Sequence, residues 1–286
     1  LARKWGQTVK GVPAARGEIL VFDNNFHGRT TTIVGFSSSE QYREGFGPFA
    51  GGYRLLPFGD ADAVAAAISE RTGAVLVEPI QGEAGIVIPP EGFLRRLRDI
   101  TQEHNALLIA DEIQSGLGRT GALFAFQHDR IRPDMVIVGK ALSGGCYPVS
   151  GILADSPLMN VFKPGDHGST FGGNPLGAAV AREALKVLVE EKMIENSASL
   201  GVYALERLQE IRSPHIQEVR GRGLWIGIEL NPQAGGARRF CEQLAAEGIL
   251  CKETHTHVIR VSPPLVISRQ ELDWALDRFE KVLMRP

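Results

Sequence analysis

Residues 134–145 read Asp134-Met135-Val136-Ile137-Val138-Gly139-Lys140-Ala141-Leu142-Ser143-Gly144-Gly145. The short apolar run in this stretch predicts a buried strand, which ends at a lysine followed by small residues and a glycine pair. A lysine is rarely fully buried unless its charge is paired or removed. Formation of an imine at Lys140 would remove that charge, whereas a solvated lysine at a strand end is the simpler alternative.

A second apolar run, at residues 106–110, is followed directly by Asp111. Two near-continuous apolar runs separated by helical patterning predict neighbouring parallel strands in a sheet covered on both faces. Ligands of such sheets gather at the carboxyl ends of the strands. We therefore expect Asp111 and Lys140 to meet one small molecule from two sides. Pyridoxal phosphate (PLP) requires this pair, a lysine for a Schiff base and an acid that keeps the ring nitrogen protonated.

The composition limits the classes of partner. Of the 286 residues, 43% are hydrophobic, which is ample for a large core and for two domains. The net charge of −2 gives no basic footprint for nucleic acid or an anionic membrane. We find no apolar run long enough to span a bilayer and recognise no signal peptide.

The cysteines and histidines predict no metal site and no disulfide framework. Cys146, Cys241 and Cys251 have neither CxxC spacing nor an even count, so we expect reduced thiols and a cytoplasmic location. His255 and His257 are the only histidines close together, and this spacing is more typical of a loop or strand surface than of zinc ligands.

Alternating strand and helix patterns predict an α/β domain with a mainly parallel sheet. After the helical stretch that ends at about residue 211, the pattern changes to that of a smaller α+β domain. The expected strands are residues 18–22, 74–77, 106–110, 135–138 and 149–153, and then 217–219, 224–230, a piece near 249 and 258–261. The expected helices are residues 61–71, 92–104, 176–192, 198–211 and 269–284, and residues 37–59 are expected to form a long surface loop.

A series of motifs resembles the class III (ω-) aminotransferases of PLP fold type I. The motifs are Phe26-His27-Gly28-Arg29, residues 78–83 (Glu-Pro-Ile-Gln-Gly-Glu), 111–114 (Asp-Glu-Ile-Gln), 139–145 (Gly-Lys-Ala-Leu-Ser-Gly-Gly) and 168–175 (Gly-Ser-Thr-Phe-Gly-Gly-Asn-Pro). The resemblance runs the whole length of the chain. It implies PLP as cofactor, a PLP-binding large domain at residues 1–193 with a mainly parallel mixed sheet, and a small C-terminal α+β domain at residues 194–286.

Within this family, the ornithine aminotransferases look most similar, on residues 45–49, 132–134, 147–150 and 259–265. That resemblance implies a ping-pong transfer of the δ-amino group of ornithine to 2-oxoglutarate, giving glutamate and glutamate 5-semialdehyde, which cyclises to pyrroline-5-carboxylate. Acetylornithine and other ω-aminotransferases are an alternative, because His27 resembles the acetylornithine enzymes at a position where ornithine aminotransferases often have another aromatic residue. A non-catalytic binding module on an aminotransferase scaffold is a second alternative.

The resemblance also implies roles for residues around the cofactor ring. Lys140 would form the Schiff base and carry the proton between substrate and cofactor, for which its amine must be neutral, as desolvation favours. Asp111 would pair with the pyridinium nitrogen, although an aspartate after a strand also suits a helix N-cap. Gln114 would bond the phenolic oxygen, and Ile113 and Phe26 would cover the two ring faces.

Other residues would bind phosphate and substrate. Ser169 and Thr170 resemble the phosphate contact that this family donates across a dimer interface, which implies a homodimer or higher oligomer. Arg29 would bind the α-carboxylate of ornithine, since a guanidinium binds a carboxylate bidentately. Glu83 resembles the family's gate, which covers Arg260 while the diamine binds and leaves it for 2-oxoglutarate.

The start of the chain is also informative. Leu1, Trp5 and Val9 fall near one face of a short helix, so the chain begins inside an element rather than at a methionine. The family's glycine-containing phosphate loop, at a helix N-terminus, would precede Leu1. We therefore expect an N-terminally incomplete chain that builds only part of the cofactor site.

Overall fold

The computed structural model describes residues 1–285. Contacts divide the chain into two compact units: unit 1 comprises residues 1–79, 89–114 and 126–184, and unit 2 comprises residues 80–88, 115–125 and those from 185 onward. Two short segments of the first half of the sequence thus belong to unit 2. The domain boundary expected at residues 193 and 194 stays a prediction.

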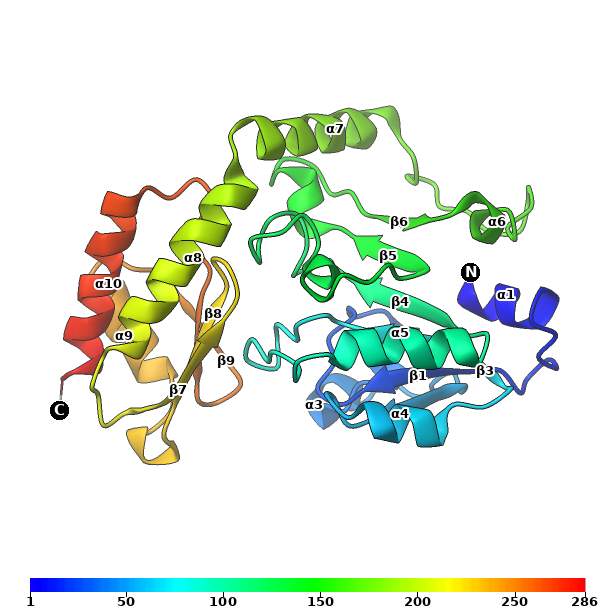
Figure 1. The fold of residues 1–286 in the computed structure, drawn as a ribbon, viewed down its shortest axis with the longest axis horizontal. Coiled ribbons are helices and arrows are strands. Elements are labelled where there is room, and N and C mark those ends of the chain that lie inside the picture. Colours follow the sequence, from blue (N-terminus) through cyan, green and yellow to red (C-terminus); the bar gives the residue numbers. More distant parts are fainter. Residues whose placement is uncertain (286) are drawn as a thin grey trace. The chain divides into compact units, whose positions relative to one another are not determined.

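Unit 1 is built on a mixed sheet with the strand order β2-β1-β3-β4-β5-β6 (Figure 1). The strands are β1 (Glu18–Phe22), β2 (Tyr53–Leu56), β3 (Thr72–Val77), β4 (Leu107–Asp111), β5 (Met135–Val138) and β6 (Gly151–Ala154). All neighbouring strands pair in parallel except β5 and β6, which are antiparallel. The register sets Val77 opposite Ala110 and Asp111 opposite Ile137. The predicted mainly parallel sheet is confirmed.

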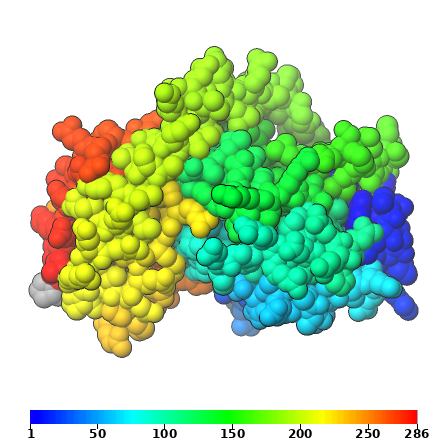
Figure 2. Space-filling model, viewed as in Figure 1, coloured from blue at the N-terminus to red at the C-terminus, as the bar shows by residue number. Residues whose placement is uncertain are grey.

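Alternate side chains of a strand point to opposite faces of this sheet. Both faces of its central strands are buried, each by a different cluster. Val75 and Leu108 pack in one cluster with α4 (Ala61–Ala67) and α5 (Phe93–Glu103), whereas Leu76 and Ile109 pack in another cluster with α1 (Ala2–Thr8). Figure 1 shows α4 and α5 in front of the strands, and the cyan to green atoms of this part of the chain form the near surface in Figure 2. Burial on both faces explains why these strands read as continuous apolar runs.

The segment 37–59 differs from its prediction as a long surface loop. It contains α3 (Glu40–Arg43) and β2, which extends the sheet by pairing with β1. The remaining short helices of unit 1 are α2 (Thr31–Gly35) and α6 (Ser156–Met159). Both α3 and β2 are four residues long, too short to produce a recognisable period in the sequence.

Unit 2 has an antiparallel sheet with the order β7-β8-β10-β9. Its elements are β7 (Ile216–Gly221), β8 (Ile226–Leu230), β9 (Lys252–Thr254), β10 (Val258–Val261), α8 (Met193–Gln209), α9 (Arg238–Ala246) and α10 (Arg269–Leu283). Ile226, Ile228 and Leu230 alternate along β8 and share a buried cluster with residues of all three helices. The predicted α+β pattern is confirmed, but the strand expected near residue 249 lies instead at β9.

The helix α7 (Pro175–Glu190) precedes α8 in the sequence, and its first half belongs to unit 1. Within residues 1–285, we find no helix whose length and apolar character would let it cross a membrane.

Candidate active site

Parallel strands of unit 1 bring several chemically useful residues to one edge of the sheet. Asp111 is the last residue of β4, Glu78 directly follows β3, and Lys140 follows β5 by two residues. The loop after β1 carries Phe26 and His27. Because β1, β3, β4 and β5 run parallel, their carboxyl ends meet at this edge, where ligands of α/β sheets bind.

The Asp111 carboxylate is held from two sides. His27 Nδ1 lies 2.6 Å from Asp111 Oδ2, and the Ile113 backbone N–H donates to Asp111 Oδ1 at 3.1 Å. The side chains of His27 and Asp111 are only 3% and 5% exposed. Turns rather than a helix follow Asp111, so its carboxylate does not cap a helix there.

The charges around His27 favour its protonated form. Burial disfavours the imidazolium, but the hydrogen bond with Asp111 and the negative charges of Glu78 and Asp111 outweigh this effect, so the pKa of His27 is raised above its ordinary value. A charged His27 donates to Asp111 and compensates a buried carboxylate. The arrangement therefore presents an oriented anion at the end of β4.

Glu78 and the aromatic residues fix the loop after β1. The Phe26 backbone N–H donates to Glu78 Oε2 at 3.0 Å. The Phe26 ring meets the Tyr42 ring edge-on with centroids 6.0 Å apart. Arg29 lies over both rings, 3.9 Å from the Tyr42 centroid and 5.4 Å from that of Phe26. These cation–π contacts hold an exposed guanidinium beside the loop.

Gln114 has an unused donor. Its amide nitrogen Nε2 is buried and makes no hydrogen bond with any described residue. Such groups are rare and indicate a missing partner. Ile113 lies beside Gly139, the residue that precedes Lys140, because a Cβ added to Gly139 would be 3.5 Å from Ile113 Cγ1. An anionic Asp111, an orphan amide donor at Gln114 and a lysine on the next strand together fit the ring of PLP.

Lys140 opens a short 3₁₀-helix at residues 140–143 with a backbone φ of +44°. This left-handed conformation costs a lysine about 1–3 kcal/mol and is concentrated at functional sites. The lysine is exposed, so the desolvation expected from the sequence is not provided by the described residues. A solvated lysine at a strand end, the simpler alternative, would be exposed too. The left-handed backbone conformation is the feature that distinguishes Lys140 from such a lysine.

Lys140 and Ser169 line the same cavity of unit 1, which has a volume of about 550 Å³. Its other polar lining includes Ser143, Ser150 and Asn174. Thr170 is exposed next to Ser169 but is not part of this lining. The structure thus places Ser169 in the cavity of Lys140 of the same chain, whereas the resemblance implies a contact with the cofactor of the other copy.

Unit 2 contains the other predicted substrate residues. Arg260 on β10 donates to Glu83 Oε1 at 2.9 Å, and both side chains are 22% exposed. Glu83 lies in a turn that the pairing of Gln81 with Val87 closes. The predicted contact between the glutamate and Arg260 is therefore formed within this unit, whereas Arg29 belongs to unit 1.

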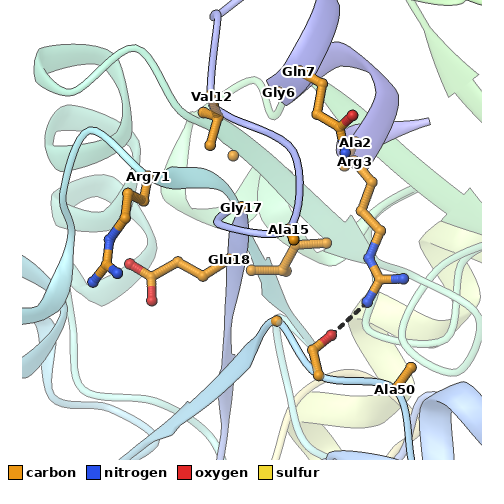
Figure 3. Close-up of a pocket in the computed structure, with 14 residues that line it drawn as sticks. Ala2, Arg3, Gly6, Gln7, Val12, Ala15, Gly17, Glu18, Ala50 and Arg71 are labelled. Atoms are coloured by element: carbon orange, nitrogen blue, oxygen red, sulfur yellow. Dashed lines mark hydrogen bonds between the residues drawn. The ribbon is translucent and has the colours of Figure 1, made fainter.

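A different hollow of unit 1 lies at the opposite edge of the sheet. It has a volume of about 410 Å³ and is lined by Glu18 and Gly73, near the amino ends of β1 and β3. Figure 3 shows Arg3 reaching across it, where the guanidinium donates to the Gly51 carbonyl at 2.8 Å. Because ligands of parallel sheets bind at the carboxyl ends, this hollow is not the candidate site.

Residues 1–285 contain no group of three or more His, Cys, Asp and Glu side chains that could hold a metal ion. The sequence reasoning missed Tyr42, the role of Glu78 and the partnership of His27 with Asp111. The only local signals were that His27 directly follows Phe26 and that Glu78 directly follows a buried strand, much as Asp111 ends one.

Comparisons with known proteins show the family of this chain. The family profile described as aminotransferase class-III matches residues 1–283. The ornithine aminotransferase of Geobacillus sp. is 55% identical over 281 residues, which is 98% of this chain and 70% of that protein. The chain thus spans about 70% of the length of such curated relatives.

Solved structures of two aminotransferases share the fold of this chain. The ornithine aminotransferase of Toxoplasma gondii, described with partial occupancy of PLP at its active site, superposes with a TM-score of 0.97 at 41% identity over 99% of this chain and 68% of that one. The acetylornithine aminotransferase of Elizabethkingia anophelis superposes with a TM-score of 0.88 at 44% identity over 99% of this chain and 70% of that one.

Proposed function

We propose that this chain, which belongs to the class-III aminotransferase family, is an ornithine δ-aminotransferase that transfers the δ-amino group of ornithine to 2-oxoglutarate. The family makes it a PLP-dependent transferase. The observation that carries the catalytic reading is the placement of Asp111, held by His27, at the end of the strand next to the one that delivers Lys140. The ornithine assignment is supported by relatives at 53% and 55% identity over 98% of the chain.

The residues of unit 1 would hold PLP around its ring. When bound, PLP supplies an electron sink for the carbanion of the substrate. Asp111 would accept a hydrogen bond from the ring nitrogen and keep it protonated, and Gln114 Nε2 would donate to the phenolic oxygen. Ile113 and Phe26 would cover the ring faces. Lys140 would hold the cofactor and then move the proton through its side-chain amine.

The charged residues would select the substrates. Arg29, held over Tyr42 and Phe26, would bind the α-carboxylate of ornithine so that the δ-amine reacts. Glu83 would neutralise Arg260 while the cationic diamine binds and would release it to bind a carboxylate of 2-oxoglutarate. Two uncovered arginines would repel the cationic diamine. The ion pair of Glu83 with Arg260 would remove this repulsion while the diamine binds.

A homodimer or higher oligomer would complete the phosphate site. Ser169 and Thr170 are exposed, and so are the neighbouring apolar side chains of Phe171 (74%) and Leu176 (57%). Ser169 and Thr170 would contact the phosphate of a cofactor bound by the other copy. The cytoplasmic location stays a prediction from the cysteines, all three of which are free thiols.

An acetylornithine aminotransferase is the second candidate. Its specific support is the structure from Elizabethkingia anophelis, whose 44% identity exceeds the 41% of the Toxoplasma gondii ornithine aminotransferase. A side-by-side assay with ornithine and N-acetylornithine separates the two. A higher kcat/KM for the acetylated substrate would reject the ornithine assignment.

The catalytic reading is tested with Lys140→Ala, scored by the visible absorbance of PLP bound to the protein and by ornithine-dependent formation of glutamate. Lys192→Ala is the matched control, because Lys192 is also a lysine with a left-handed backbone (φ +53°) but precedes a helix of unit 2. We expect Lys140→Ala alone to lose the absorbance band and the turnover. Retention of both by Lys140→Ala would reject Lys140 as the catalytic lysine, whereas absence of both from the unsubstituted protein would leave only a non-catalytic binding module.

A further inference from the structure

Arg220 on β7 makes an unusual set of contacts with the turn that carries Glu83. Its side chain is 14% exposed. Nη2 donates to the Gly85 carbonyl at 2.8 Å, and Nε donates to the Gly85 and Ile86 carbonyls at 3.1 and 3.2 Å. Nη1 donates to Glu218 at 2.7 Å and also to Glu229. One edge of the guanidinium thus binds backbone carbonyls while the opposite nitrogen binds carboxylates.

The turn that Arg220 binds has a backbone that needs outside support. Gly85 has a φ of +111° and Ile86 a φ of +55°. A β-branched residue with a positive φ is a genuine outlier, and such conformations persist only where the surroundings determine them. The Ile86 side chain is fully buried in a small cluster with Ile80 and Trp225. Burial holds the side chain of Ile86, and Arg220 holds the carbonyls.

Two further contacts connect this turn to Glu83. Thr254 Oγ1 donates to the Glu83 carbonyl at 2.5 Å, while the Glu83 carboxylate accepts from Arg260. On the other side, β8 approaches closely at Gly227, where an added Cβ would lie 2.8 Å from the Gly85 carbonyl oxygen. Glu83 therefore reaches Arg260 from a turn whose path is fixed on several sides.

We propose that Arg220 is a positioning residue for Glu83: by binding the Gly85 and Ile86 carbonyls, it sets the turn so that the Glu83 carboxylate covers Arg260. This inference rests on the proposed roles of Glu83 and Arg260 in substrate selection. Arg220 itself touches no substrate in this scheme. It acts by fixing the turn, so that only the Glu83 side chain has to move when a carboxylate takes its place on Arg260.

The fork of the guanidinium makes the proposal specific. A lysine at position 220 would keep a positive charge beside Glu218 and Glu229, but its ammonium is a point charge that cannot reproduce the planar fork on two adjacent carbonyls. Arg220→Lys therefore separates the two tasks. If Arg220 only balances the two glutamates, lysine should replace it without loss.

The test compares both half-reactions of the holoenzyme, with kcat and KM for ornithine and for 2-oxoglutarate. We expect Arg220→Lys to raise KM for ornithine about tenfold, the effect of one lost hydrogen bond to a charged group, with little change in KM for 2-oxoglutarate. Glu83→Gln should show the same shift. In the Glu83→Gln background, Arg220→Lys should change the ratio of the two KM values no further, because both act through one side chain.

Two more variants keep the outcome clear. Gly227→Ala displaces the turn from the side of β8 without removing a charge, and we expect it to shift the KM ratio in the same direction. Arg238→Lys is the matched control, because Arg238 also bonds two glutamates, Glu242 and Glu253. Its side chain is 72% exposed, and these two bonds do not involve the turn that carries Glu83. We expect no shift of the ratio for it.

The results distinguish failure of the positioning role of Arg220 from failure of the proposed function. If Glu83→Gln shifts the KM ratio but Arg220→Lys and Gly227→Ala do not, the positioning role is overturned and the proposed function stands. A purely structural role would lower the thermal midpoint and weaken both half-reactions equally, which also overturns the proposal. If Glu83→Gln leaves the ratio unchanged, the proposed role of Glu83 fails, and the inference fails with it.

Discussion

Replacement of His27 tests the buried pair that we place behind the cofactor ring. The two side chains are 3% and 5% exposed, and the atoms His27 Nδ1 and Asp111 Oδ2 lie 2.6 Å apart. Removing one partner of a buried ion pair leaves the other charge uncompensated and costs about 3–5 kcal/mol. We expect His27→Leu to lower the free energy of unfolding by this amount. His27→Gln keeps a neutral donor and should be less damaging by about 2 kcal/mol.

The effect of His27 should depend on pH with a defined sign. The pKa of His27 is raised in the folded state above the ordinary value of 6.5: burial opposes the charge, but the bond to Asp111 and the charges of Glu78 and Asp111 outweigh it. A raised pKa contributes stability that is fully present below the unfolded pKa and is lost as the pH rises through the folded pKa. The advantage of the wild type over His27→Leu should therefore shrink above pH 6.5.

Urea unfolding followed by far-UV circular dichroism, repeated from about pH 6 to about pH 9, measures this difference. The wild type and both variants are compared at each pH, so that titration of groups remote from His27 cancels. A difference between wild type and His27→Leu that stays constant, or that grows with pH, would refute the assignment of a charged His27. An equal loss in His27→Gln and His27→Leu would show that packing, rather than the donor, matters.

Three further substitutions test the site and the units around it. Gln114→Leu should weaken PLP binding about tenfold in absorbance titrations but leave the cofactor-free protein no less stable, because it removes a buried donor without a partner. Gly201→Ala should cost about 2–4 kcal/mol in urea unfolding, since the added Cβ would lie 2.2 Å from the carbonyl carbon of Gly223, whereas Val202→Ala, at a 59% exposed position, should cost little. Ser268→Ala removes the N-cap of α10 and should lower the free energy of unfolding by about 1 kcal/mol.

The strand ends could be predicted because the local pattern contains the information. The buried strands β3, β4 and β5 read as apolar runs, and a charged residue at the end of the run or just after it marks the carboxyl edge, as for Asp111 and Lys140. The helix predicted at residues 92–104 also matches α5 (Phe93–Glu103), which Gly92 and His104 flank. Here the period of the sequence and the burial in the structure agree.

Contacts between distant segments left no such local signal. His27 and Asp111 are 84 positions apart, and their pairing depends on the order β1-β3-β4 in the sheet. Residues 80–88 and 115–125 likewise belong to unit 2, where Ile86 shares a cluster with the distant Trp225 and Arg119 donates to the Leu224 carbonyl. The strand β9 was predicted near residue 249 for a different reason: three residues are too few to produce a recognisable period in the sequence.

The two charge pairs of the predicted site differ in a way that fits different tasks. The pair of His27 and Asp111 is almost fully buried, so that separating its charges would leave each without water. Glu83 and Arg260 are each 22% exposed, so that water can solvate both groups when they separate. Exposed ion pairs contribute only about 0–1 kcal/mol to the free energy of unfolding. The contribution of a pair at intermediate burial lies between that of an exposed pair and that of a buried pair.

A carboxylate that replaces Glu83 on Arg260 forms the same kind of bond as the one it displaces. The exchange therefore requires little net free energy as long as the displaced glutamate reaches water. The opposite holds for Asp111, where no incoming group could replace the buried His27 without a large loss. Burial thus suits the first pair to the proposed task of holding a cofactor in a fixed orientation and the second pair to the proposed exchange between two substrates.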